Sequence, residues 1–155
     1  MVKRVGRVIS LMSILVLVLA TATWAQPGKG PGGGQGRGWG AGDPYSRMYN
    51  PKTVETLSGE VVSVDKFTPG KKMSYGVHFT LKTEKETIPV HLGPSWHMEK
   101  QAVTIAAGDK VEVTGSRIMY QDKPAIIAAE VKKGDRVLKL RDAAGVPAWA
   151  GQGRQ

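Results

Sequence analysis

The stretch from Val77 to Gln101 reads VHFTLKTEKETIPVHLGPSWHMEKQ, and it contains the clearest indications of the fold. Apolar and polar side chains alternate before the charged sequence TEKE and again after it, which predicts two half-buried strands joined in a hairpin. Gly93-Pro94 then ends the second strand. The seven residues from Ser95 to Gln101 have the character of a helical turn with Ser95 as its N-cap, and Trp96 is expected to cover an open end of the folded domain.

Further strands are predicted on both sides of this stretch. Residues 54–67, VETLSGEVVSVDKF, are rich in β-branched residues, and Gly59 in their interior indicates a bulge or a sharp bend. The alternation after the helix predicts strands at 111–120, 125–131 and 137–140. Three strands, a short helix and two more strands follow the order of an OB-fold. We therefore expect an all-β protein, a small five-stranded OB-fold-like Greek-key barrel with one short helix and an extra C-terminal strand.

Three segments carry a resemblance to a known group of proteins. LSGEVVSVD at 57–65, GDKVEVTGS at 108–116 and AIIAAEVKKGD at 125–135 resemble the bacterial periplasmic OB-fold proteins grouped as stress-tolerance OB-fold modules. The chain is also similar to exported OB-fold-like proteins with a glycine-rich N-terminus. The resemblance covers about 53–135 and implies a stress-related binding role, but its motifs are general signals of a barrel and identify no catalytic site.

The N-terminus has the layout of a secretory signal peptide. Three basic residues precede an apolar run over residues 8–20, and small residues follow it. This run is shorter than the roughly 20 residues that a membrane-spanning helix needs. We expect cleavage after Ala25, with Ala22 as the second choice and an uncleaved N-terminal anchor as the alternative. The protein is therefore predicted to be periplasmic or secreted, with no transmembrane segment after cleavage.

The residues after the signal peptide are dominated by glycine. Nine glycines lie between Gly28 and Gly42, and such a segment buries too little apolar surface to offset the entropy lost on ordering. We therefore expect a flexible tether. The predicted organisation is a signal peptide at 1–25, a disordered Gly/Pro-rich tether at 26–50, an OB-fold-like barrel at 53–141 and a C-terminal tail at 142–155.

Charge and cysteine content limit the candidate functions. Removal of the signal peptide leaves 19 basic and 13 acidic residues, a net charge of +6. The chain has no cysteine, so no disulfide stabilises it in an oxidising compartment. Sequence patterns typical of serine hydrolases, zinc proteases, P-loop NTPases and dinucleotide-binding enzymes are absent. We expect a non-enzymatic protein without a cofactor.

Two histidines are candidates for a metal site. His78 and His91 share the outward face of the predicted hairpin, and a two-residue turn at Glu84-Lys85 would place them directly opposite each other. Cross-strand neighbours have Cβ atoms about 5 Å apart, close enough for two imidazoles to bind one ion. Met73, His97 and Met98 would add a third ligand, and this donor set suits copper or zinc. Glu-Lys is, however, a poor sequence for so tight a turn, and a longer loop would separate the pair.

Basic residues at the predicted loops provide the favoured hypothesis. A ligand-binding rim is expected where OB-folds commonly bind, and its candidate residues are Lys66, Phe67, Lys71, Lys72, Tyr120 and Lys123. Such a rim suits an anionic envelope component or an acidic protein partner, bound by a monomer or a weak oligomer. Nucleic acid is a second alternative, but it is disfavoured because the outward positions of the hairpin carry no stripe of aromatic side chains.

Overall fold

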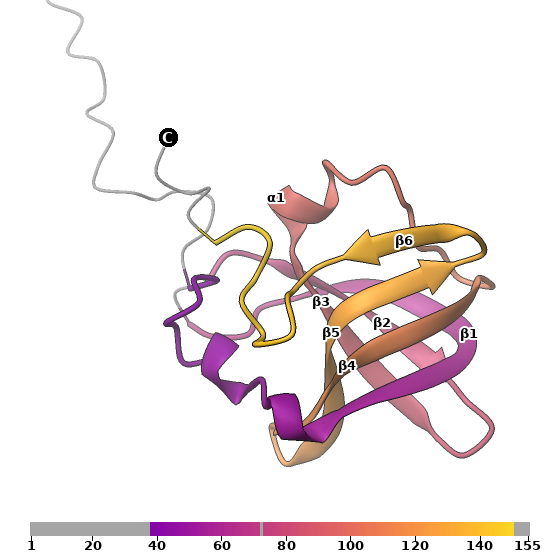
Figure 1. Cartoon of the computed structure of the whole chain (residues 1–155), viewed down its shortest axis with the longest axis horizontal. Coiled ribbons are helices and arrows are strands. Elements are labelled where there is room, and N and C mark those ends of the chain that lie inside the picture. The colour runs from indigo at the N-terminus through magenta and orange to yellow at the C-terminus, as the bar shows by residue number, and fades with distance from the viewer. Residues whose placement is uncertain (1–37, 72, 151–155) are drawn as a thin grey trace, which may run out of the picture.

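The computed structural model describes residues 38–71 and 73–150, which form one sheet of six strands that closes into a barrel (Figure 1). No helix in these residues is long and apolar enough to cross a membrane. Two short 3-10 helices, Ser46–Met48 and Pro51–Thr53, precede the strands. The strands are β1 (Val54–Phe67), β2 (Gly76–Lys82), β3 (Thr87–Pro94), β4 (Lys110–Tyr120), β5 (Lys123–Lys133) and β6 (Arg136–Lys139). The helix α1 (Ser95–Met98) lies between β3 and β4.

The strands form one sheet that closes on itself. Its order is β3-β2-β1-β4-β5-β6, with antiparallel pairing between neighbours. A short parallel pairing of β3 with β5, at Val90 with Ile126 and His91 with Ile127, closes the ring. β6 pairs only with β5 and is the expected extra strand. The predicted all-β, OB-fold-like Greek-key barrel with one short helix is thus confirmed.

β1 is long because it pairs with two partners in turn. Residues 54–60 pair with β4, and residues 60–67 pair with β2. Gly59 lies where the partner changes, and a Cβ atom there would come within 2.3 Å of the carbonyl oxygen of Lys82. The irregularity in the register lies slightly later, between Val61 and Ser63. Gly59 therefore allows a close approach of two backbones. The bulge that we expected at Gly59 lies a few residues later in the same strand.

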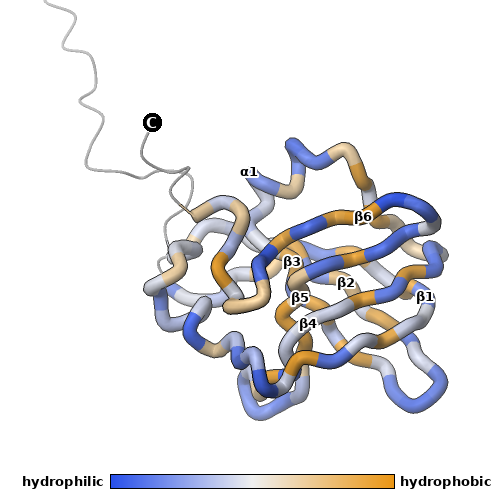
Figure 2. The backbone as a smooth tube through the Cα atoms, in the orientation of Figure 1, coloured by the Kyte–Doolittle hydropathy of each residue, from blue (hydrophilic) through white to orange (hydrophobic). Residues whose placement is uncertain are grey.

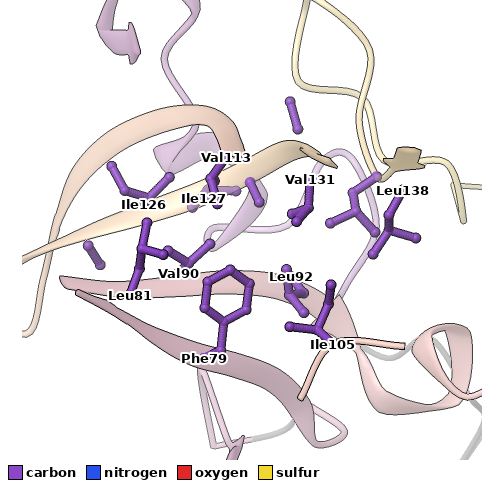
Figure 3. Close-up of a cluster of buried hydrophobic side chains, with 14 of the residues drawn as sticks. Phe79, Leu81, Val90, Leu92, Ile105, Val113, Ile126, Ile127, Val131 and Leu138 are labelled. Atoms are coloured by element: carbon purple, nitrogen blue, oxygen red, sulfur yellow. The ribbon is translucent and has the colours of Figure 1, made fainter. Parts of the chain in front are cut away.

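Most of the core follows from the alternation of side chains. Apolar and polar residues alternate along most of the strands (Figure 2), whereas residues 125–129 of β5 form a continuous buried run. Figure 3 shows how the inward side chains from opposite walls meet, and the central ones are Phe79, Leu81, Val90, Leu92, Val113, Ile126, Ile127 and Val131. All eight are completely buried or nearly so. Without a disulfide, this apolar packing is what stabilises the domain.

The helix α1 is shorter than expected and is capped differently. It spans Ser95–Met98, and its N-cap residue is Pro94, with no side-chain cap. The expectation that Ser95 would cap the helix was therefore wrong. Trp96 is half-buried against the core, and His97 is buried, with its ring centroid 5.0 Å from that of Trp149. The helix thus forms a corner of the barrel that packs against the end of the chain.

The two ends of the described chain clasp each other at one end of the barrel, where Figure 1 shows them side by side. Trp39 and Trp149 are almost completely buried, and the Trp149 Nε1–H donates to the carbonyl oxygen of Trp39 over 2.8 Å. The expectation of a disordered tether was wrong for residues 38–50, because Trp39, Tyr45 and Tyr49 join the core. The remaining part of that tether, the signal peptide and residues 151–155 lie outside the described residues.

Candidate functional site

The two histidines of the hairpin lie opposite each other on neighbouring strands. His78 on β2 pairs with His91 on β3, and their ring centroids are 5.8 Å apart with the planes inclined by 17°. This is the register that a two-residue turn requires. The turn at Glu84-Lys85 thus has the two residues that the predicted opposition of His78 and His91 requires.

The turn tolerates Glu84-Lys85 because a side chain supports it. The N–H of Thr83 donates to the carbonyl of Glu86 over 2.8 Å, and the Thr83 hydroxyl accepts from the N–H groups of Lys85 and Glu86 over 3.2 and 3.0 Å. Neither Glu84 nor Lys85 has a positive φ. A threonine that satisfies the turn's N–H groups replaces the glycine that such a hairpin usually needs.

Aromatic rings from three other segments enclose His91. The Phe67 ring, at the end of β1, lies 4.4 Å from the His91 ring and 5.0 Å from the His78 ring, centroid to centroid. Tyr120 at the end of β4 lies 4.9 Å from His91, and Tyr45 from the N-terminal segment stacks on it at 5.9 Å. The expectation that both histidines face outward was wrong for His91, which is only 1% exposed. Tertiary contacts cover it.

Both histidines, together with Phe67 and Tyr120, line a pocket of about 480 Å³. Its walls come from the ends of β1 and β4, from within β2 and β3, and from the start of β5. The lining residues are Phe67, Thr68, His78, Pro89, His91, Tyr120, Gln121, Lys123, Pro124 and Ala125. No aspartate or glutamate belongs to this lining. The pocket therefore combines apolar walls with two imidazoles and one ammonium group, a composition typical of small-molecule sites.

Hydrogen bonding fixes the deepest histidine. The Nδ1 atom of His91 lies 2.8 Å from the hydroxyl of Tyr45, and both groups are buried. Burial, reinforced by the charges of His78 and Arg141, lowers the pKa of His91 to about 3. Burial likewise raises the pKa of the Tyr45 hydroxyl. Both groups are therefore uncharged at neutral pH, and His91 has only Nε2 left for the pocket.

A buried arginine lies behind this pair. Arg141 is 6% exposed, and its Nη1 donates to the carbonyls of Leu92 and Ala128 over 3.1 and 2.6 Å. Its guanidinium carbon lies 4.9 Å from the ring centroid of Trp149. Within residues 38–71 and 73–150, Nε and Nη2 have no hydrogen-bond partner, and no carboxylate forms an ion pair with Arg141. Burial lowers its pKa to about 10, so the group stays positively charged at neutral pH.

The structure places the residues of the predicted ligand-binding rim at different surfaces of the barrel. Phe67, Tyr120 and Lys123 line the pocket together with both histidines. Lys66 instead lines a groove of about 250 Å³ beside α1, because neighbouring residues of a strand point to opposite faces. Lys71 is exposed in the loop after β1, and the side chain of Lys72 lies outside the described residues.

The candidate third metal ligands lie elsewhere. Met73 packs against Gly38, where a Cβ atom would come within 2.1 Å of its Cγ, and His97 lies beside Gln101 and Trp149. Met98 lines the groove beside α1. In the part of the chain that the structure describes, no three histidine, aspartate or glutamate side chains come together as a metal-binding group. The histidine pair would thus need ligands from outside the described residues to complete a metal shell.

Sequence reasoning missed two residues of this site. Tyr45 and Arg141 lie outside the predicted strands, in segments interpreted as a tether and as the end of the barrel. One signal for the first was available, because Tyr45, Met48 and Tyr49 have the spacing of one face of a helix. Nothing in the local sequence distinguishes Arg141 from the exposed basic residues around it.

Comparison with known proteins gives two similarities. The chain is similar to an alanine racemase of Geobacillus kaustophilus (strain HTA426), with 29% identity over 108 residues. That alignment covers 62% of this chain but only 28% of the racemase, so this chain spans little more than a quarter of that enzyme's length.

The second similarity is to a protein family. The model of the MamS/MamX magnetosome protein family matches residues 53–138, more than half of the chain. The matched residues run from the 3-10 helix before β1 into β6, and they include Phe67, His78, His91, Tyr120 and Lys123. The chain therefore belongs to the MamS/MamX magnetosome protein family.

Proposed function

We propose that this chain is an exported, non-enzymatic binding module that holds an anionic ligand in the pocket between Phe67, His78, His91, Tyr120 and Lys123. The name of the family connects its members with the magnetosome, and we extend that setting to this chain as part of the proposal. Export rests on the N-terminal sequence alone. The stress-related role implied by the resemblance to periplasmic OB-fold modules stays a prediction.

The charge around the pocket is the observation that carries the proposal. Its lining contains Lys123 and two imidazoles but no carboxylate. Behind His91 lies the cation of Arg141, which has no ion-pair partner among the described residues. A buried charge without a partner acts over a longer range than an exposed one, because little water screens it. The field in the pocket therefore attracts an anion and repels a cation.

The same geometry supports a binding role over a catalytic one. Nucleophilic catalysis needs a base within hydrogen-bond reach of the nucleophile and a third group that orients the base. In residues 38–71 and 73–150, no serine or threonine hydroxyl bonds to either histidine of the pocket. His91 is also held uncharged by burial, which makes it a weak base at neutral pH.

Copper or zinc at His78 and His91 is the second candidate, and the register of the hairpin favours it. Two imidazoles opposite each other on neighbouring strands form a common basis for a transition-metal site. The charge of Arg141, which is unpaired within residues 38–71 and 73–150, and the absence of a carboxylate in the lining weigh against a divalent cation there. The experiment for the anion therefore includes the metal.

We would record the ring NMR signals of His78 and His91 in the full-length chain while adding inorganic phosphate, and in separate samples zinc or copper. We expect phosphate to shift both rings, with an affinity that falls as salt is added. Lys123→Glu should weaken phosphate binding about tenfold. Lys139→Glu makes the same charge change on exposed β6 and should leave binding unchanged.

Two results would contradict the proposal. One is that no anion-induced shift, from phosphate or from an organic carboxylate, depends on Lys123. The other is stoichiometric binding of zinc or copper that moves both rings and disappears in His78→Ala, which would establish the metal site instead.

A further inference from the structure

Burial determines which partner donates in the hydrogen bond between Tyr45 and His91. Tyr45 is 4% exposed, and among the described residues its hydroxyl has no hydrogen-bond partner except His91 Nδ1. If Nδ1 carried the proton, the Tyr45 O–H would be buried without an acceptor, at the full cost of desolvation. Tyr45 must therefore donate, and His91 Nδ1 must accept.

The proton of the uncharged imidazole is then on Nε2. His91 presents an N–H donor to the pocket, and a metal ion would need the lone pair that this proton occupies. Moving the proton of His91 from Nε2 to Nδ1 would leave the buried Tyr45 O–H without an acceptor. The Tyr45 hydroxyl thus acts as a positioning group that makes the floor of the pocket a donor to oxygen.

The walls indicate what the oxygen is attached to. Besides the polar groups, the lining consists of Phe67, Pro89, Tyr120, Pro124 and Ala125, which are apolar or aromatic. A volume of about 480 Å³ fits a small organic molecule. A phosphate dianion would leave most of its oxygens facing apolar walls, and such desolvation is costly without several donors. A carboxylate needs fewer donors and brings an apolar body with it.

We propose that the pocket binds an organic carboxylate, whose oxygen accepts from His91 Nε2–H while its apolar body packs between Phe67 and Pro124. Lys123 at the mouth balances the negative charge. This inference rests on the proposed anion-binding function and names its ligand class. It also assigns Tyr45, which lies outside the residues matched by the family model, as a determinant of specificity.

Benzoate, benzamide and inorganic phosphate are suitable probes for the full-length chain. Benzamide has the shape of benzoate without its charge, and phosphate has charge without an apolar body. We expect NMR titration to show benzoate binding about tenfold more tightly than either. Long-range nitrogen spectra at neutral pH should show the proton of His91 on Nε2.

A pair of tyrosine variants tests the positioning group. Tyr45→Phe keeps the ring but removes the donor, so the Nε2–H form of His91 should lose population and benzoate affinity should fall about fivefold. Tyr49→Phe makes the same change at a second buried tyrosine, which forms no hydrogen bond with His91, and should alter neither quantity.

The outcomes separate this inference from the function on which it rests. A proton on Nδ1, equal affinity for benzoate and benzamide, or equal effects of the two tyrosine variants would overturn the carboxylate assignment. If phosphate still bound in a Lys123-dependent way, the anion-binding function would stand. If neither anion bound, both proposals would fail, and zinc or copper bound through both rings would replace them.

Discussion

At position 91 an imidazole lies among aromatic rings at the bottom of a pocket, with almost none of its surface exposed to solvent. His91 is 1% exposed, and its pKa is lowered to about 3 mainly by burial. The unfolded chain has no such enclosure, so there the imidazole titrates near its usual value of about 6.5. The difference links the stability of the domain to pH.

The free energy of unfolding should therefore fall as the pH drops below about 6.5. In that range His91 binds a proton in the unfolded chain but stays uncharged in the folded domain. The stabilisation is complete above that value and declines towards pH 3. Between pH 6 and pH 5 we expect a loss of about 1 kcal/mol from this residue, measured by urea unfolding.

His91→Gln should flatten this dependence, since it removes the titrating group. The pKa of His97 is also lowered by burial, with the charge of Lys100 adding to the effect, so His97→Gln serves as the matched control and should remove only a smaller part. Equal slopes in the wild-type protein and in His91→Gln would contradict the enclosure of His91.

Among the elements, the hairpin turns between β2 and β3 and between β4 and β5 differ in their strain. Gln121 and Asp122, between β4 and β5, both have positive φ angles of 50° and 63°. Two such residues in a two-residue hairpin are typical of a type I′ turn, which favours Asn-Gly. The turn between β2 and β3 has no positive φ and depends on Thr83 instead.

Gln121→Asn combined with Asp122→Gly should therefore raise the free energy of unfolding by about 1 kcal/mol, because it relieves strain without removing a core contact. Thermal and urea unfolding would measure it. The same dipeptide at Glu84-Lys85 is the control, and it should bring no gain because the backbone there is not left-handed. An equal gain at both turns would show that flexibility, and not turn geometry, is responsible.

At the scale of the whole molecule, the domain is larger than the segment that the family shares. The family match spans 53–138, but the clasp of the two chain ends adds Trp39, Tyr45 and Trp149 to the core. A Cβ atom at Gly76 would come within 2.5 Å of the Trp39 ring, and one at Gly93 would come equally close to the Trp149 ring. The strands are thus shaped to receive these two tryptophans.

A chain of residues 53–138 should unfold at much lower urea concentration than a chain of residues 38–150. In the longer chain, Trp149→Ala should cost about 3–5 kcal/mol, the usual effect of deleting a buried tryptophan. The full-length protein is the reference for both. The clasp would be irrelevant to stability if the short and the long chain had the same urea midpoint.

The strands and their order were predictable because each depends on local alternation of side chains. The bounds of β1 agree with the predicted strand at 54–67, and Gly93-Pro94 does lead from β3 into α1. The opposition of His78 and His91 also follows from sequence, once the turn is known to contain two residues. Period and turn chemistry act over a few residues, so a sequence determines them by itself.

The site itself was decided by contacts between distant segments. Tyr45 and His91 are 46 residues apart, and Trp39 and Trp149 are 110 residues apart. Apart from the spacing of Tyr45, Met48 and Tyr49, no local pattern shows that the glycine-rich segment contributes aromatic rings to the core. None shows that Arg141 is enclosed while nearby basic side chains stay in water. Burial, and with it the tautomer of His91 and the charge of the pocket, arises only when the barrel closes and the chain ends pack over it. The sequence alone therefore determined the barrel, and tertiary packing determined what the barrel can bind.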